Sequence, residues 1–220
     1  MKSPQRKDRA AFTLLEVMAV ITIIVILAVL AVIGLSAALE KHARSKAIVQ
    51  VALITKALEE YNSDMGTYPV TANSSDAVSG NNSQILYEKL FYEGYQNSIA
   101  AVPDPAKAQK IYLPELDPRS SKQGWVDVVD PATPPPASVT IKDPWSKPYA
   151  YRTAKSPAGT PNPLTLNPGF DLWSRGKDGN TNTAVPADTV NRDDIKNFLR
   201  FVRRRGLQIN IRRGGSASLS

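Results

Sequence analysis

The chain has 220 residues, a formal net charge of +7, no cysteine and one histidine. The lack of cysteine excludes disulfides, thiolate metal sites and a thiolate nucleophile. A catalytic dyad or triad that uses histidine would need His42, which lies just after an apolar run and is interpreted as a solvated helix residue. No enzyme is therefore predicted. Basic residues gather near the two ends of the chain rather than across its middle, so no specific nucleic-acid binding is predicted either.

Residues 1–11 form a basic leader, and residues 17–39 follow as an apolar run of 23 residues without a charge. As a helix this run would span ~35 Å, enough for a bilayer core of ~30 Å. Because basic residues precede the run, its N-terminal end is predicted to stay in the cytoplasm while the rest crosses. The alternative is a secretory signal cut after Ala37 or Ala38, although such signals usually have apolar regions of only ~7–15 residues.

Glu16 stands at the edge of the apolar run, where a charge is costly and usually has a partner. If the chain is cut between Ala11 and Phe12, the new amine of Phe12 lies four residues from Glu16, on the same helix face. The two charges could then neutralise one another within one chain or between neighbours. A pairing between neighbours would select one axial offset, so Glu16 is predicted to direct packing of the helix against copies of itself.

The segment "AFTLLEVMAVITIIVILAVLAVIGL" resembles the N-terminal methylation and assembly segment of type IV pilins and of type II secretion pseudopilins. The resemblance implies that a prepilin peptidase cuts before Phe12 and methylates its amine. It also makes Glu16 the assembly acid at the fifth mature position. Two positions depart from the family pattern: Ala11 replaces the usual Gly before the cut, and Gly34 lies near the place of a common Pro.

After residue 39 the apolar pattern becomes amphipathic, and neither a proline nor a turn cluster separates the two halves. One continuous helix is therefore predicted from about residue 12 to about residue 62, ended by Gly66 and Pro69. The stretch "YNSDMGTYPV" resembles the turn that follows this helix in the major pseudopilin. The residues expected to face a soluble head are Ala47, Val51, Ile54, Leu58 and Tyr61.

The first part of the head is predicted to contain little regular structure. Residues 71–83 are expected to form a loop, and residues 84–94 a short amphipathic helix that buries Ile85, Leu86, Leu90 and Phe91. The proline-rich residues 96–140 are expected to be irregular and exposed, with one strand around residues 125–129.

Two later segments resemble the major pseudopilin more closely. "DPWSKPYAYR", residues 143–152, resembles its D-P-W-G-N-P-Y-x-Y-R hairpin, with Ser146 in place of Gly and with Tyr149 and Tyr151 on one strand face. "GFDLWSRGKDG", residues 169–179, resembles its strand that runs into a turn. Trp145 and Trp173 are interpreted as core or interface packing.

Three carboxylates in the last part of the head suggest a calcium site. Asp178 lies in a glycine-flanked turn, and Asp193 and Asp194 follow about fifteen residues later across a loop that needs something to close it. The resemblance implies calcium bound by Asp178, by the acidic pair of "DDIKNF" and by backbone carbonyls, among which that of Arg175 is the best placed. The alternative makes Asp178 a turn former and the pair the acidic start of a last helix.

The predicted fold is α+β and type IV pilin-like: a long N-terminal helix packed on a small antiparallel-sheet head. Its basic C-terminal extension could form an edge strand, with a solvated tail as the default. The predicted parts are the cleaved leader (1–11), the membrane and assembly helix (12–39), its amphipathic continuation (40–65), the periplasmic head (66–198) and the basic extension (199–220).

The predicted function is that of a structural subunit of a type II secretion pseudopilus. The resemblance implies a single-pass protein of the bacterial inner membrane with a periplasmic head. Its partners would be copies of itself, the prepilin peptidase, the inner-membrane secretion platform and minor pseudopilins. The alternatives are a type IV pilin for adhesion, motility or DNA uptake, and a secreted or membrane-anchored binding protein.

Overall fold

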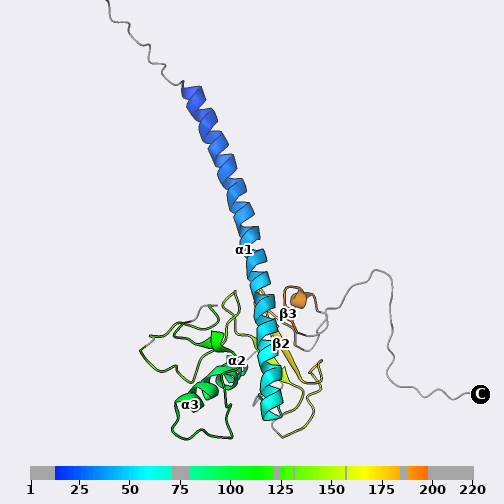
Figure 1. The fold of residues 1–220 in the computed structure, drawn as a ribbon. Coiled ribbons are helices and arrows are strands. Elements are labelled where there is room, and N and C mark those ends of the chain that lie inside the picture. The colour runs from blue at the N-terminus through cyan, green and yellow to red at the C-terminus, as the bar shows by residue number, and fades with distance from the viewer. Residues whose placement is uncertain are drawn as a thin grey trace, which may run out of the picture.

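The computed structural model describes residues 13–70, 80–120, 124–130, 132–156, 158–183 and 188–197. It consists of one long helix with a head packed against the C-terminal half of that helix (Figure 1). The predicted cleavage site at Ala11 and Phe12, the position of Phe198 and the basic extension lie outside the described residues.

Helix α1 (Leu14–Met65) runs for 52 residues and passes through Gly34 without a break. It ends at Gly66, whose left-handed backbone (φ 74°) lets its N–H donate to the carbonyl of Asn62 at 2.9 Å. The prediction of one continuous helix that stops at Gly66 is confirmed. The predicted stripe is also confirmed, because the following α1 side chains are buried in the core: Ala47, Val51, Ile54, Leu58 and Tyr61.

Three short strands form an antiparallel sheet beside the lower half of α1 (Figure 1). Strand β2 (Phe170–Ser174) is central and pairs with β1 (Ala150–Thr153) on one side and with β3 (Ile195–Lys196) on the other. In this register Ala150 faces Trp173, and Ser174 faces Ile195. The small antiparallel sheet and the long helix confirm the α+β prediction.

Tyr149 and Tyr151, on their predicted shared face, tie the sheet to α1 and to the chain that follows it. Both are fully buried. The Tyr149 hydroxyl donates to Gln50 Oε1 at 2.8 Å, and the Tyr151 hydroxyl donates to the carbonyl of Pro69 at 2.8 Å. Each ring therefore fills the core while its polar tip has a partner, which removes the cost of burying an unpaired hydroxyl.

The short helix predicted at residues 84–94 is longer than expected. Helix α2 (Gly80–Tyr87), the π-helical turn η1 (Glu88–Tyr92) and helix α3 (Glu93–Ile99) follow one another directly, so residues 80–83 are helical and not part of a loop. Leu86, Leu90 and Phe91 are buried as predicted, but Ile85 is only half-buried. Gly94 does not end the helix: a Cβ there would overlap the carbonyl of Lys110, so the glycine permits close packing.

The strand predicted around residues 125–129 is wrong, because the described part of this segment forms bends and no strand. The segment is also less exposed than predicted. Trp125 is fully buried, and its carbonyl accepts a hydrogen bond from Lys142 N at 2.6 Å. Upstream, the 3₁₀ turn η2 (Pro114–Leu116) buries Leu116.

The turn from Asp143 to Lys147 is the hairpin expected before β1. The buried Asp143 carboxylate closes it by accepting the N–H groups of Trp145 at 3.0 Å and Lys147 at 2.8 Å. Its other oxygen accepts the Ser174 hydroxyl at 2.6 Å, which joins the turn to β2. Burial raises the pKa of Asp143, and these hydrogen bonds act in the opposite direction. Ser146 has φ 63°, the left-handed region that favours glycine.

Replacing Ser146 by Gly should stabilise the head by about 0.5–1 kcal/mol, because a side chain in the left-handed region costs more than the added chain entropy of glycine. Denaturant unfolding in detergent micelles, followed by tryptophan fluorescence, measures the change. The matched control is Ser45→Gly in the exposed interior of α1, which should destabilise by about 0.5 kcal/mol. Equal losses in the two variants would contradict the assigned turn geometry.

Candidate functional site

Helix α1 begins at a capping box formed by Thr13 and Glu16. The Thr13 hydroxyl accepts the N–H of Glu16 at 3.2 Å, and Glu16 Oε2 accepts the N–H of Thr13 at 3.4 Å. Glu16 therefore has a local role that sequence analysis missed, although the T-x-x-E spacing indicates it. The cap also turns the carboxylate back toward the start of the helix, where a cut before Phe12 would create an amine.

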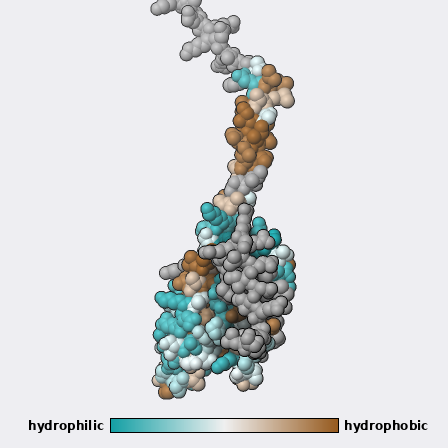
Figure 2. Space-filling model, turned by 90° about the vertical axis from the view of Figure 1, so that its right-hand side faces the viewer, coloured by the Kyte–Doolittle hydropathy of each residue, from teal (hydrophilic) through white to brown (hydrophobic). Residues whose placement is uncertain are grey.

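The described side chains of the N-terminal half of α1 are exposed, and this half lies away from the head. One 18-residue window reaches a mean hydropathy of 3.2 with none of it buried, so this helix is long and apolar enough to cross a membrane. Figure 2 shows a hydrophobic band along this half, which projects from a head whose coloured surface in that view is mostly hydrophilic. Large side chains such as Ile21, Ile24 and Leu27 are more than half exposed. Such a surface needs lipid or other apolar helices around it.

The turn after β2 brings Asp178 and Asp193 together. Asp193 Oδ2 accepts the N–H of Asp178 at 3.2 Å, while Asp178 Oδ1 accepts the N–H of Asn180 at 2.8 Å. Gly176 (φ 64°) lies so close that a Cβ there would overlap the Asp193 carboxylate. Arg175, the predicted carbonyl ligand, stands between the end of β2 and this glycine. Two of the predicted carboxylates and the predicted carbonyl residue thus belong to one turn region.

Asp194 has a different environment from Asp193. Its side chain is fully buried, and Oδ2 accepts the Thr181 hydroxyl at 2.9 Å and lies 3.4 Å from Lys196 Nζ. Oδ1 is buried without a partner among the described atoms. Burial raises the pKa of Asp194 to about 6, against the opposing effects of Thr181 and Lys196. This carboxylate is therefore incompletely compensated, which fits the chemistry of a cation ligand.

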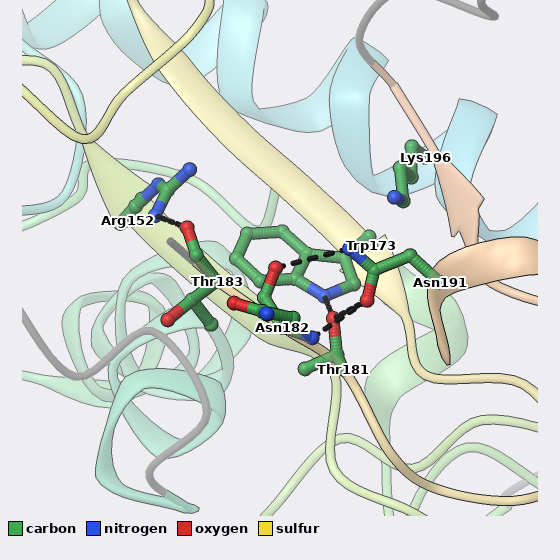
Figure 3. A pocket seen from close by; sticks show the side chains of 7 residues that line it. All are labelled: Arg152, Trp173, Thr181, Asn182, Thr183, Asn191 and Lys196. Atoms are coloured by element: carbon green, nitrogen blue, oxygen red, sulfur yellow. Dashed lines mark hydrogen bonds between the residues drawn. The ribbon is translucent and has the colours of Figure 1, made fainter. Parts of the chain in front are cut away.

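A polar network holds residues 181–183 against the sheet (Figure 3). The Trp173 indole N–H donates to Thr181 Oγ1 at 3.2 Å, and Asn191 Oδ1 accepts the N–H of Asn182 at 2.6 Å. Sequence analysis missed Asn191, which comes from the 3₁₀ turn η3 (Thr189–Arg192). The network encloses a small cavity lined by Arg152, Trp173, Thr181, Asn182, Thr183, Asn191 and Lys196.

Within the described ranges, no three acidic or histidine side chains are grouped closely enough to hold a metal ion. The structure joins Asp178 to Asp193 and pairs Asp194 with Thr181 and Lys196. Residues 184–187 of the same loop lie outside the described part. The alternative of a last helix starting at the acidic pair is wrong, because the following residues enter β3. Calcium binding stays a prediction.

Residues 6–38 match the prokaryotic N-terminal methylation motif. The match covers residues 6–11 of the basic leader, the predicted cleavage site, Glu16 and nearly all of the apolar run, and it does not extend into the head. No curated protein and no solved structure matches the chain. The motif supports a membrane-anchored, type IV pilin-like protein, and it implies processing by a prepilin peptidase; pilin-like proteins with this motif are structural.

The mature protein in the membrane fraction should begin with a methylated Phe12. The reason is that the matched motif contains the predicted cut between Ala11 and Phe12. Mass spectrometry of the N-terminal peptide measures this directly. Ala11→Gly, which restores the usual residue before the cut, should be processed at least as completely. A mature protein that begins near Leu39 would instead establish a conventional signal peptide.

Proposed function

We propose that this protein is a structural subunit of a type II secretion pseudopilus, which polymerises through α1 to help export folded proteins. The observation that carries the proposal is the methylation motif on a helix whose apolar half has no partner in the described head. This apolar half can leave the lipid and pack against the same half of neighbouring subunits. In that exchange the helices form the filament core and the heads form its surface.

The sequence patterns of the head favour the pseudopilus over an adhesive or motile pilus. The hairpin before β1, the strand-to-turn segment of β2 and the "DDIKNF" stretch all resemble the major pseudopilin. Type IV pilins usually close this region with cysteines, and this chain contains none. A type IV pilin nevertheless remains the second candidate, because the motif at residues 6–38 is shared by both groups.

Glu16 would provide the register of the assembled helices. In a bundle of apolar helices its carboxylate leaves the aqueous boundary, and a buried charge is costly unless it is paired. In the single chain its bond to Thr13 N is long, at 3.4 Å, and joins it to a neutral group. The methylated amine of a neighbouring subunit would supply the missing charge at only one axial offset.

Glu16→Gln separates this role from helix capping. Glutamine can still accept the Thr13 N–H in a capping box but carries no charge. We expect Glu16→Gln and Glu16→Ala to be cleaved and inserted normally but to lower filament yield at least about tenfold, the effect of losing ~1.4 kcal/mol. Electron microscopy of filaments and immunoblots of the membrane fraction measure the two steps.

The matched control is Thr13→Ala, which removes the cap and keeps the charge. It should assemble far better than Glu16→Gln. If Glu16→Gln forms normal filaments while Thr13→Ala does not, capping is the role of this pair and the register argument fails.

We also propose that calcium closes the turn around Asp178 and Asp193, with Asp194 and the carbonyl of Arg175 as further ligands. The support is the adjacency of the first two residues and the unpartnered buried oxygen of Asp194. A bound divalent cation would offset the negative charge of the turn and the incomplete compensation of Asp194.

Calcium should raise the melting temperature of the detergent-solubilised protein by several degrees, because a ligand at 100 times its Kd stabilises by about 2.7 kcal/mol. Differential scanning calorimetry with calcium, magnesium or a chelator measures the shift. Asp193→Asn and Asp178→Asn should abolish it, whereas Asp127→Asn, at an exposed carboxylate, should not. A shift that is unchanged in Asp193→Asn would place calcium elsewhere.

A further inference from the structure

Directly after its apolar run, α1 carries a group of cations that the proposed function does not use. Lys41 and Arg44 are exposed on the first turns of α1 after Leu39, and Lys46 is half-buried two residues later. At ~1.5 Å per residue these three lie within ~10 Å of the end of the run. Figure 2 shows hydrophilic residues at the end of the head from which the helix projects.

Two loops of the head reach the same level of α1. Lys177, from the turn after β2, lies with its Nζ 3.8 Å from Glu40 Oε2. The Trp145 indole N–H, from the hairpin before β1, donates to the same Glu40 oxygen at 3.3 Å. Lys147 belongs to that hairpin and is exposed. A Cβ at Gly179, in the turn that carries Lys177, would overlap the Lys147 side chain, so the two loops lie side by side.

We propose that Lys41, Arg44, Lys147 and Lys177, with Trp145 among them, form a basic collar that binds anionic phospholipid headgroups of the leaflet from which α1 emerges. The collar holds the head of the unassembled subunit against the membrane surface. This inference rests on the membrane span of the proposed function but not on filament formation.

The position of the charges favours lipid as the partner. Cations that follow a span on its translocated side oppose the positive-inside preference, so they act against the predicted orientation and need another reason to be there. They lie within about one Debye length, ~8 Å, of the headgroup layer, where attraction to anionic lipid is strong. Glu40 offsets little of this charge, because Lys177 remains 71% exposed in their surface ion pair.

The placement of Trp145 is an independent observation. It is only half-buried, whereas Trp125 and Trp173 are at most 2% exposed. Tryptophan with an apolar ring and a hydrogen-bonded N–H is enriched at the membrane–water boundary. Here the N–H is bonded to Glu40, the first residue after the apolar run. Trp145 therefore stands at the depth of the headgroups.

Quenching of Trp145 fluorescence by a headgroup spin-labelled lipid tests the collar in the full-length protein reconstituted into vesicles. We expect strong quenching in mixed phosphatidylglycerol–phosphatidylcholine vesicles, and weak quenching in phosphatidylcholine alone or at high salt. Each cation near an anionic surface changes the ratio of docked to undocked heads about fivefold. Lys41→Gln with Lys177→Gln should therefore lower the ratio of docked to undocked heads about 25-fold.

The matched control removes two exposed lysines far from the collar. Lys56 lies ~25 Å beyond Leu39 along α1, and Lys107 lies in the loop whose Lys110 contacts Glu60 and Asp64. Lys56→Gln with Lys107→Gln should leave quenching unchanged, and Trp145→Phe should remove the quenched signal.

Equal quenching in neutral and anionic vesicles, or equal effects of the two lysine pairs, would overturn the collar. Persistence of the quenched signal in Trp145→Phe would overturn it as well. Flotation with the vesicles separates these outcomes from failure of the membrane span. A protein that does not float with either kind of vesicle would overturn the span and the collar together.

Discussion

A single helix surrounded by two different environments is the constraint on which the other features of this chain depend. The N-terminal half of α1 is apolar on every side and needs lipid or other helices. The C-terminal half is apolar along one stripe, which contacts η1, β2 and β3. No turn separates the two halves, so the depth of the helix in a membrane or a filament also sets the position of the head.

Without cysteines, the last part of the head is held by buried polar contacts. Arg152 and Asp171 face each other on β1 and β2, with Arg152 Nε 3.0 Å from Asp171 Oδ2 and both side chains almost fully buried. Asp171 also accepts the N–H groups of Leu166 and Asn167, and Arg152 donates to the carbonyl of Thr183. A buried ion pair repays its desolvation only when such additional hydrogen bonds exist. Here they join two further segments of chain, residues 166–167 and the segment of Thr183, to the centre of the sheet.

Sequence analysis predicted the features whose cause is local. The 3.6-residue period fixed the buried stripe of α1, Gly66 ended the helix, and alternation placed Tyr149 and Tyr151 on one face. The errors arose where a distant segment decides the structure. Gly94 permits the approach of Lys110, which no local pattern indicates, and Trp125 is buried by packing rather than by strand pairing. In the candidate site, the adjacency of Asp178 and Asp193 depends on the pairing of β3 with β2.

Two carboxylates bracket the apolar run, and their partners differ in kind. Glu40 receives Trp145 and Lys177 from the head, so it has partners within the chain at the boundary where α1 enters water. Glu16, ~36 Å away along the helix, is bonded only to the exposed N–H of Thr13 among the described residues. A monomer in a membrane can leave such a carboxylate at the aqueous surface. In a bundle of helices the same group is buried, so assembly requires a positive partner for Glu16 but leaves Glu40 as it is.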